Sequence, residues 1–416
     1  MIRYGMIGIG GFATTWLRSL DALEREGTAK LSAAVVRNPD KYASQVAALR
    51  EAGCAIYPSL DAMLADARGR IDIVGVPTGI AAHVPMAAAA MQAGYPTLIE
   101  KPVCATIQDA LHLATVEQQT GQWCAVGYQW IYSPTIQWLR QRLASRELGQ
   151  IRQAKTRIGW PRADRYYARN PWAGQLRIGD RWVLDGPATN ATAHYMTNML
   201  YLCAAADPAD ARLLHVRGEL YRARDIESYD TSAIELHLAG GARLLHLATH
   251  AMRETVNPEM DITTDRADIH WDASTTRATI RHHDGRIETH EDADPAANHQ
   301  RPLAHSAQIV AGQAERPLCG LLEGTPHVLA INLAFESSRG VHSIPAGQMQ
   351  RTTAGQDGAL VCVIGMEEAL DRAYQEASTF SDLGLPWAQA TSPAEADGYA
   401  RFPRDPELPA RLGISE

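Results

Sequence analysis

The sequence predicts an α/β fold followed by an α+β fold. We expect an N-terminal Rossmann dinucleotide-binding domain over residues 1–126 and a C-terminal open-faced, mainly antiparallel β-sheet domain with helices on one face over residues 127–385. In the first region short apolar segments alternate with helical segments, which is typical of a parallel sheet covered by helices. A glycine-rich turn directly follows the first apolar segment. In the second region, alternation of apolar and polar residues is punctuated by hairpin turns.

The first domain should contain five short strands with helices between them. One helix starts after Asn38-Pro39, a capping residue followed by proline at the first helical position, and ends at Gly53. An alanine-rich helix covers residues 81–93 and ends at Gly94. The expected strands are residues 2–7, 32–36, 72–76, 97–99 and 123–127.

The second domain should combine helices with a sheet of hairpins. Turn signals at Gly240-Gly241 and Asp284-Gly285 separate alternating segments. The expected strands are 213–220, 232–238, 243–249 and 277–282, and the expected helices are 134–146, 187–203 and 359–379. The proline-rich residues 386–416 lack periodicity and should form a C-terminal arm, either on the surface or in an oligomer contact.

Composition and charge exclude several classes of function. The 416 residues carry a net charge of −8 with a pI of about 6.0, so we expect no nucleic acid and no membrane surface as partner. The N-terminus lacks a secretory signal pattern and no apolar run is long enough to span a membrane, which predicts a cytoplasmic protein. The six cysteines have no CxxC spacing and should be buried, reduced thiols. The fifteen histidines show no ligand spacing, so we expect no metal site.

Residues 8–13 read Gly-Ile-Gly-Gly-Phe-Ala and have GxGxxA spacing. The first glycine makes a tight turn, the second lets the backbone approach a pyrophosphate, and the small last residue lets a helix pack on the strand. The diphosphate then meets free N–H groups at the positive end of that helix. Glycine turns are common, but this one lies between a strand and a helix and therefore predicts dinucleotide binding. The expected contacts are Gly8, Gly10, Gly11, Phe12 and Ala13.

The end of the second strand bears on the choice of cofactor. A carboxylate there would hold the ribose 2′-hydroxyl of NAD. This strand ends in Val36-Arg37-Asn38, with no acid before Asp40. The cofactor is therefore expected to be NAD(P), leaning to NADP, with Arg37 on the 2′-phosphate. Alternatively, Arg37 stacks on the adenine and either cofactor binds.

Lys101 is one of four lysines among the 39 basic residues, and it lies in Glu100-Lys101-Pro102 after an apolar strand. Unlike arginine, a partly desolvated lysine can exchange a proton near neutral pH. Lys101 is therefore a candidate for proton transfer. The alternative is that it is a leftover of arginine-rich codon usage.

Together with Val76-Pro77-Thr78, His83, Gly94 and Val126-Gly127-Tyr128, this tripeptide resembles the glucose–fructose oxidoreductase/inositol dehydrogenase (Gfo/Idh/MocA) family. The resemblance is close over the N-terminal domain and looser beyond it. It implies hydride transfer between nicotinamide and a hydroxyl or keto carbon of a sugar, polyol or sugar derivative, with Lys101 in the accompanying proton transfer. The further cofactor contacts that it implies are Pro77, Thr78, His83, Glu100, Lys101 and Gln129.

In this family an Asp and a His four residues later lie on a helix of the second domain, and this chain offers Asn190 and His194. One helical turn would place both on one face. No charged residue occurs from Gly186 to Ala206, so this helix should be buried and its polar groups need partners or a ligand. Asn190 cannot supply the charge of an Asp, but it can orient His194 or bind a sugar hydroxyl. His194 could alternatively be a core histidine. The candidate catalytic residues are Lys101, His194 and Asn190.

An aromatic loop over residues 159–172 precedes that helix. Rings beside arginines suit the apolar faces and hydroxyls of a carbohydrate, or an acidic group on it. A surface hairpin with incidental aromatics is the alternative. The candidate substrate residues are Lys101, Trp160, Arg162, Tyr166, Tyr167, Asn170, Trp172, Asn190 and His194.

These patterns favour an NAD(P)-dependent dehydrogenase or reductase of a small-molecule carbohydrate. One alternative is an NAD(P)-dependent enzyme that cleaves glycosides by transient oxidation, and another is a non-catalytic NADP(H)-binding regulatory protein. Because an open sheet face usually needs a partner, we expect a homodimer or homotetramer through the C-terminal sheet.

Overall fold

The computed structural model describes residues 1–414, which fall into two compact units. The first unit comprises Met1–Cys104, Asp109–Ser133 and Asp294–Thr325. The second comprises Ala105–Gln108, Pro134–Ala293 and the described part of Pro326–Glu416. Neither unit is continuous in sequence: the first includes Asp294–Thr325, which the sequence pattern had placed in the second domain.

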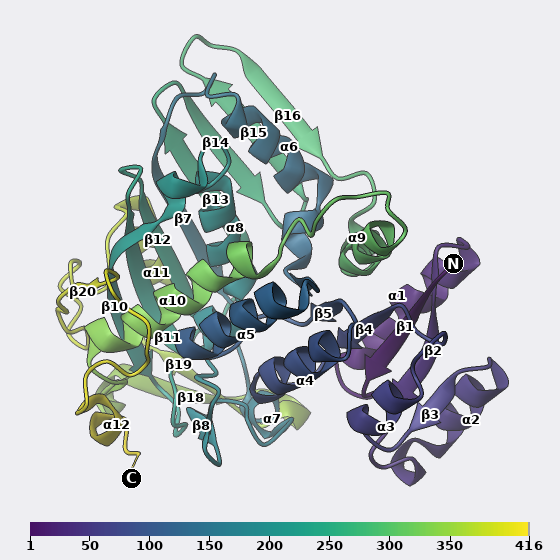
Figure 1. Ribbon diagram of the computed structural model, residues 1–416. Coiled ribbons are helices and arrows are strands. Elements are labelled where there is room, and N and C mark those ends of the chain that lie inside the picture. Colours follow the sequence, from purple (N-terminus) through teal and green to yellow (C-terminus); the bar gives the residue numbers. More distant parts are fainter. Residues whose placement is uncertain (415–416) are drawn as a thin grey trace. The chain divides into compact units, whose positions relative to one another are not determined.

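The first unit is built on a six-stranded parallel sheet of order β3-β2-β1-β4-β5-β6 (Figure 1). The five expected strands are confirmed to within three residues at each end, and β3, only three residues long, was not expected. The strands are β1 Ile2–Ile7, β2 Ala29–Val35, β3 Ala55–Tyr57, β4 Ile73–Val76, β5 Thr97–Ile99 and β6 Cys124–Val126.

Helices connect these strands as a doubly wound sheet requires. The alanine-rich helix is confirmed as α4, and the helix expected after Pro39 is present as a short 3₁₀ turn, η1, followed by α2. The break between them falls at Tyr42, whose φ of −122° is not helical. The helices are α1 Ala13–Arg25, η1 Asp40–Tyr42, α2 Ala43–Glu51, α3 Leu60–Ala65, α4 Ile80–Gln92, α5 Ile107–Thr120, η2 Gln129–Tyr132, η5 Pro295–His299 and α9 Arg301–Val310.

Helix α9 completes the core of the first unit from far along the chain. Its Leu303 and Ala307 are buried against Trp16 and Leu20 of α1. The hydroxyl of Tyr4 donates to the carbonyl of Leu303 at 2.6 Å, across 299 residues of sequence. The first unit therefore has a parallel sheet whose core is closed by a late segment.

The second unit contains a ten-stranded sheet with the path β16-β15-β14-β13-β7-β12-β11-β10-β17, and β20 also pairs with β10 (Figure 1). Neighbours are antiparallel except in the β7–β12 and β10–β17 pairs, so the expected mainly antiparallel sheet is confirmed. Strands β7, β13, β14 and β16 and the two-residue strands β17 and β20 were not expected. The strands are β7 Ile151–Gly159, β10 Leu213–Arg222, β11 Thr231–Leu238, β12 Arg243–Thr249, β13 Val256–Thr264, β14 Ala267–Asp272, β15 Arg277–His282, β16 Ile287–Glu291, β17 His342–Ser343 and β20 Ala394–Glu395.

Helices pack on one face of this sheet. Helix α6 (Pro134–Ala144) contacts β15 and β16, and α8 (Ala193–Cys203) contacts β7 and β12. The part of α10 (Leu321–Ser338) that belongs to this unit packs on β10 so closely that a Cβ on Gly218 would lie 2.6 Å from the Cα of Ala334. Only glycine allows this approach.

Part of the opposite face is also covered, by the chain's own C-terminal region. The hairpin of β18 (Met349–Thr353) and β19 (Ala359–Val363), together with α11 (Met366–Gln375), buries side chains of β10, β11 and β12. The single helix expected over 359–379 is thus wrong in its first part. Residues 359–363 pair with β18 as a strand, and the left-handed Gly365 (φ 74°) separates them from α11.

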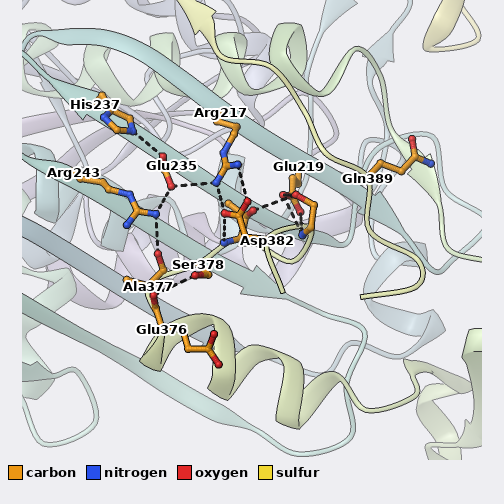
Figure 2. A network of polar contacts seen from close by, with 12 residues as sticks. Arg217, Glu219, Glu235, His237, Arg243, Glu376, Ala377, Ser378, Asp382 and Gln389 are labelled. Atoms are coloured by element: carbon orange, nitrogen blue, oxygen red, sulfur yellow. Dashed lines mark hydrogen bonds and ion pairs between the residues drawn. The ribbon is translucent and has the colours of Figure 1, made fainter. Parts of the chain in front are cut away.

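A network of charged side chains joins the segment after α11 to this face of the sheet. Figure 2 shows Arg217 of β10 between Glu235 of β11 and Asp382. Glu235 also binds Arg243 of β12 and, at 2.7 Å, His237. Each arginine in the network therefore has a carboxylate partner.

The residues after 386 pack on the second unit. Strand β20 pairs with β10, and Tyr399, Phe402 and Leu408 at the start of α12 (Leu408–Arg411) are buried. Gln108 exchanges two hydrogen bonds with the backbone of Phe402. This segment is part of the core of its unit rather than an arm detached from it.

All six cysteines are buried free thiols, as expected. Among the described residues, no helix has both the length and the apolar character that a membrane span requires.

Candidate functional site

The glycine-rich turn links β1 to α1, as its spacing predicts. Gly8 (φ +88°) and Gly11 (φ +60°) adopt the left-handed conformation that favours glycine, and an added Cβ at either would meet open space. The N–H groups of Gly10, Gly11 and Phe12 donate no hydrogen bond to any described residue. Ala13 is buried at the first position of α1. Free N–H groups at a helix N-terminus fit a diphosphate.

Tyr42 of η1 lies against this turn at Gly10, a contact that the sequence did not reveal. A Cβ on Gly10 would lie 2.3 Å from the hydroxyl oxygen of Tyr42, so a larger residue there would have to displace this ring. The Nζ of Lys41 lies 5.4 Å from the centre of the same ring. Arg37, directly beyond β2, is exposed and forms no ion pair with a described residue. Two cations and a ring therefore lie where the second strand ends.

Glu100 follows β5 and anchors the start of the motif. Its Oε1 accepts from the indole Nε1 of Trp16 at 2.8 Å, and its Oε2 accepts from the backbone N of Lys101 at 3.2 Å. Burial raises the pKa of Glu100, while the charge of Lys101 opposes the rise. Glu100 thus orients the backbone at Lys101, and the Lys101–Pro102 peptide is cis.

His83 of α4 was a candidate for cofactor contact, and the structure gives it a positioning task. Its Nδ1 lies 2.8 Å from the carbonyl of Pro102 and its Nε2 lies 3.1 Å from the carbonyl of Thr78. The ring is fully buried, and burial lowers its pKa. His83 therefore ties the loop after β4 to the loop after β5.

The candidates of the first unit gather at one edge of its sheet. Gly8, Arg37, Pro77-Thr78, Glu100-Lys101 and Gln129 each follow the carboxyl end of a parallel strand or lie within three residues of it. Ligands of open α/β sheets bind at this edge, where the strand order reverses.

In the second unit, the helix expected over 187–203 is interrupted. A π-helical turn over Pro187–Ala191 is followed by Thr192, whose φ of −109° and ψ of 10° break the helix before α8. The hydroxyl of Thr192 donates to the carbonyl of Pro187 and lies 2.9 Å from Nε2 of His246. Asn190 and His194 are both buried, but they do not share a continuous helical turn.

Asp185 is a buried carboxylate that the sequence reasoning missed. It is 3% exposed, and its Oδ1 accepts from Nδ2 of Asn190 at 2.9 Å. Its Oδ2 accepts from the backbone N of Gly174 at 2.8 Å. Because an ionised carboxylate only accepts, it fixes which end of the Asn190 amide faces it. The negative charge absent at position 190 is thus present five residues earlier. Asp185 is the last charged residue before the uncharged stretch, which was the available signal.

The aromatic loop follows β7 and contains the short helix α7 (Asp164–Ala168). The guanidinium carbon of Arg162 lies 4.8 Å from the ring centre of Tyr166 and 5.5 Å from that of Trp160. That of Arg169 lies 3.5 Å from the ring of Tyr166 and 5.3 Å from that of Trp172. All five side chains are partly exposed or exposed.

Other contacts in the second unit connect this loop to neighbouring candidates. The ring of Trp160 meets that of Tyr195, the residue after His194, edge to face at 6.1 Å. Tyr167 bonds with its hydroxyl to Nδ1 of His250 at 3.0 Å, and Asn170 accepts from the backbone N of Trp172. Tyr167 and Asn170 thus support the loop itself, while Trp160 links it to the start of α8.

Comparisons with known proteins agree with this architecture. Residues 2–128 match the family model described as "Oxidoreductase family, NAD-binding Rossmann fold" (GFO_IDH_MocA). A UDP-N-acetylglucosamine 3-dehydrogenase of Acidithiobacillus ferrooxidans is 33% identical over 140 residues, 34% of this chain and 41% of that protein. A dTDP-3,4-didehydro-2,6-dideoxy-alpha-D-glucose 3-reductase of Streptomyces violaceoruber is 28% identical over 152 residues, 36% of this chain and 43% of that protein. The matches thus span about two fifths of these relatives' length.

Solved structures extend the likeness over more of the chain. The WlbA dehydrogenase from Bordetella pertussis, solved in complex with NADH and UDP-GlcNAcA, has a TM-score of 0.66 at 21% identity and covers 81% of this chain and 96% of its own. An NAD binding oxidoreductase from Klebsiella pneumoniae has a TM-score of 0.66 at 16% identity, with coverage of 81% and 96%. At these identities the likeness establishes a shared fold.

Proposed function

Since the N-terminal domain of this chain belongs to the Gfo/Idh/MocA family of NAD-binding oxidoreductases, we propose that the protein transfers hydride between nicotinamide and a hydroxyl or keto carbon of a sugar, polyol or sugar derivative. The observation that carries the proposal is the gathering of the phosphate turn and the Glu100-Lys101-Pro102 motif at one edge of the parallel sheet. Both curated relatives are named as enzymes acting on a nucleotide-linked sugar, which supports a sugar derivative as substrate.

Bound nicotinamide would supply the hydride chemistry, and the protein residues would supply position and proton transfer. The free N–H groups of the phosphate turn would hold the diphosphate. Lys101 would take the proton of the reacting hydroxyl during oxidation and return it during reduction. Glu100 and His83 would keep the backbone on either side of Lys101 in place through the contacts described above.

The residues of the second unit would bind and orient the sugar. The amide of Asn190 donates to Asp185, which makes its carbonyl oxygen a stronger acceptor for a sugar hydroxyl. His194 would assist in proton transfer, and the rings of Trp160 and Tyr166 would contact the sugar.

The proposal is tested by turnover. Wild type is screened against sugars and polyols with NAD and NADP at 340 nm, beside Lys101→Met and the matched control Lys30→Met, which replaces a lysine of β2 away from the motif. We expect turnover in wild type and control and at least a hundredfold loss in Lys101→Met. Equal rates in all three proteins would contradict the role of Lys101.

Release of a sugar or aglycone without net absorbance change would favour glycoside cleavage instead. Binding of NADP without turnover, unaffected by Lys101→Met, would favour a regulatory protein.

We further propose NADP as the preferred cofactor. The exposed Arg37 and Lys41 lie where a 2′-phosphate would need cations, and no carboxylate precedes Asp40 after β2. Arg37→Ala should weaken NADP binding by about tenfold, as expected for loss of a charge-assisted hydrogen bond, and leave NAD binding unchanged. Equal losses for both cofactors, measured by titration of nicotinamide fluorescence, would refute this role.

We also propose a homodimer or homotetramer that uses the uncovered part of the large sheet. Asp261 of β13 and His270 of β14 face each other there at 2.7 Å, next to a hollow of about 300 Å³. The C-terminal region covers β10 to β12 on the same face and, through Tyr374 of α11, also part of β7. Light scattering after gel filtration tests this, and a monomer at micromolar concentration would contradict it.

A further inference from the structure

The aromatic loop contains more positive charge than its own acids neutralise. Of its charged residues, Asp164 pairs with Arg224 at 2.5 Å and Arg165 pairs with Asp357 at 3.3 Å. Arg162 and Arg169 form no ion pair with any residue in the described part of the chain. Two guanidinium groups are therefore left without a carboxylate.

These two groups lie close together. Both guanidinium groups contact the ring of Tyr166. The Nε of Arg162 is buried without a hydrogen-bond partner, and the guanidinium of Arg169 donates to Tyr166, from Nη1 to its carbonyl and also to its hydroxyl. Like charges on one ring repel each other. A cluster of this kind is relieved by an anion that both groups can reach.

The buried carboxylate of Asp185 does not neutralise this charge. Burial raises the pKa of Tyr166, and the negative charge of Asp185 raises it further. The two oxygens of Asp185, however, accept from Gly174 and from Asn190. One carboxylate directed at other groups leaves the pair Arg162 and Arg169 with a net positive charge.

We propose that Arg162 and Arg169 form a subsite for an oxyanion carried by the substrate, either a carboxylate or a phosphate on the sugar. The planar guanidinium fork binds both groups bidentately, and the tryptophans beside it offer apolar faces to the sugar ring. This inference rests on the proposed function and narrows its substrate class to acidic sugars.

Binding of three probes to the purified protein with NADP tests the subsite without requiring turnover. The probes are glucose, glucuronate and glucose 6-phosphate, titrated by calorimetry at low and high salt. We expect at least one anionic probe to bind tenfold or more tightly than glucose, and the advantage to fall as salt rises. Glucuronate and glucose 6-phosphate distinguish a carboxylate from a phosphate.

Variants assign the effect to the two arginines. Arg162→Gln and Arg169→Gln should each reduce the preference for the anionic probe about tenfold, and Arg169→Lys should retain part of it. The matched control Arg165→Gln, an arginine of the same loop that pairs with Asp357, should leave the preference unchanged. Thermal melting of each variant verifies that it folds.

Two outcomes overturn the subsite: equal binding of all three probes in wild type, including binding of none, or an equal loss in Arg165→Gln. The 340 nm assay on the same probes separates this inference from the proposed function. Oxidation of glucose and glucuronate with the same KM would keep the oxidoreductase and remove the subsite. Preferential binding of an anionic probe with no turnover of any carbohydrate would keep the subsite and remove the oxidoreductase.

Discussion

Two groups of arginines in the second unit show how differently the same side chain can be used. In the network of Figure 2, Arg217 forms a two-pronged contact with Asp382, and Arg243 binds Glu235. In the aromatic loop, Arg162 and Arg169 lie on rings, and the nearby carboxylate of Asp185 binds an amide instead. The first group stabilises the fold, whereas the second leaves charge available for a ligand. Partner identity therefore distinguishes structural arginines from candidate binding arginines.

The largest expected effect is on stability, in the network of Figure 2 around Glu235. Glu235→Gln leaves Arg217 and Arg243 without the carboxylate that they share, and the side chain of Glu235 is only 8% exposed. We expect the free energy of unfolding to fall by about 2–3 kcal/mol, measured by urea denaturation. Glu291→Gln, which breaks an exposed pair with Arg277, is the control and should cost less than about 1 kcal/mol. Equal losses in both variants would remove the distinction between the groups.

The same network should weaken in acid. Burial on its own would raise the pKa of Glu235, but hydrogen bonds from Arg243 and His237 hold it below its ordinary value. A depressed pKa in the folded state means that the stabilisation is complete above the unfolded pKa of about 4.3 and is lost as pH falls through the folded pKa. The stability difference between wild type and Glu235→Gln should therefore be constant near neutral pH and should disappear below about pH 4. A difference that persists at pH 3 would show that charge is not its cause.

A smaller effect is expected at Asp185. Asn190→Asp would place two carboxylates where Nδ2 of Asn190 now donates to Asp185 at 2.9 Å, so the pair must retain a proton or repel. If the pKa of one carboxyl of this pair is raised in the folded state, the pair costs no stability below the unfolded pKa. The loss of unfolding free energy then grows as pH rises through the folded pKa. We expect this variant to match wild type near pH 4 and to lose about 1–2 kcal/mol of unfolding free energy at pH 8. Asn170→Asp, whose side chain accepts from a backbone N–H, is the control and should show no such pH dependence.

The smallest effect on stability is expected for Arg162 and Arg169 of the aromatic loop. Arg162 has no side-chain hydrogen bond within residues 1–414, and the side chain of Arg169 bonds within its own loop, to the carbonyl and the hydroxyl of Tyr166. Replacing either by Gln removes ring contact worth about 0.5–1 kcal/mol but also relieves repulsion between the two. The free energy of unfolding should change by less than about 0.5 kcal/mol. A loss as large as that of Glu235→Gln would assign both arginines a structural role.

The local part of the architecture was predictable from the sequence. The conformation of residues 8–13 depends on which positions tolerate φ > 0 and close approach, and the glycines report this directly. The strands around them are buried and apolar, so their pattern is clear. The parallel pairing of these strands followed from the alternation of strand and helix.

What the sequence did not reveal depends on contacts between distant segments. The missed strand β7 has helices on one face and α11 on part of the other, which blurs the period-two pattern. Residues 359–363 are a strand because β18 is available to pair with them. The break at Thr192 is held by His246, 54 residues away, and no local signal encodes it. The sequence contains the charge of Asp185 but does not reveal its hydrogen bond with Asn190.

The late position of α9 has a consequence for synthesis. The Rossmann sheet and its phosphate turn are complete by residue 133, but the helix that packs on Trp16 and accepts from Tyr4 begins only at Arg301. A nascent chain that has not yet emerged past Val310 must hold the first sheet with this part of its apolar surface uncovered. The nucleotide-binding half, although its sheet is made first, therefore cannot finish folding on the ribosome until strands β7 to β16 of the second sheet have been synthesised. A fragment that ends at residue 133 should accordingly be recovered as an aggregating protein, whereas one that is fused to residues 294–325 has all the segments of the unit.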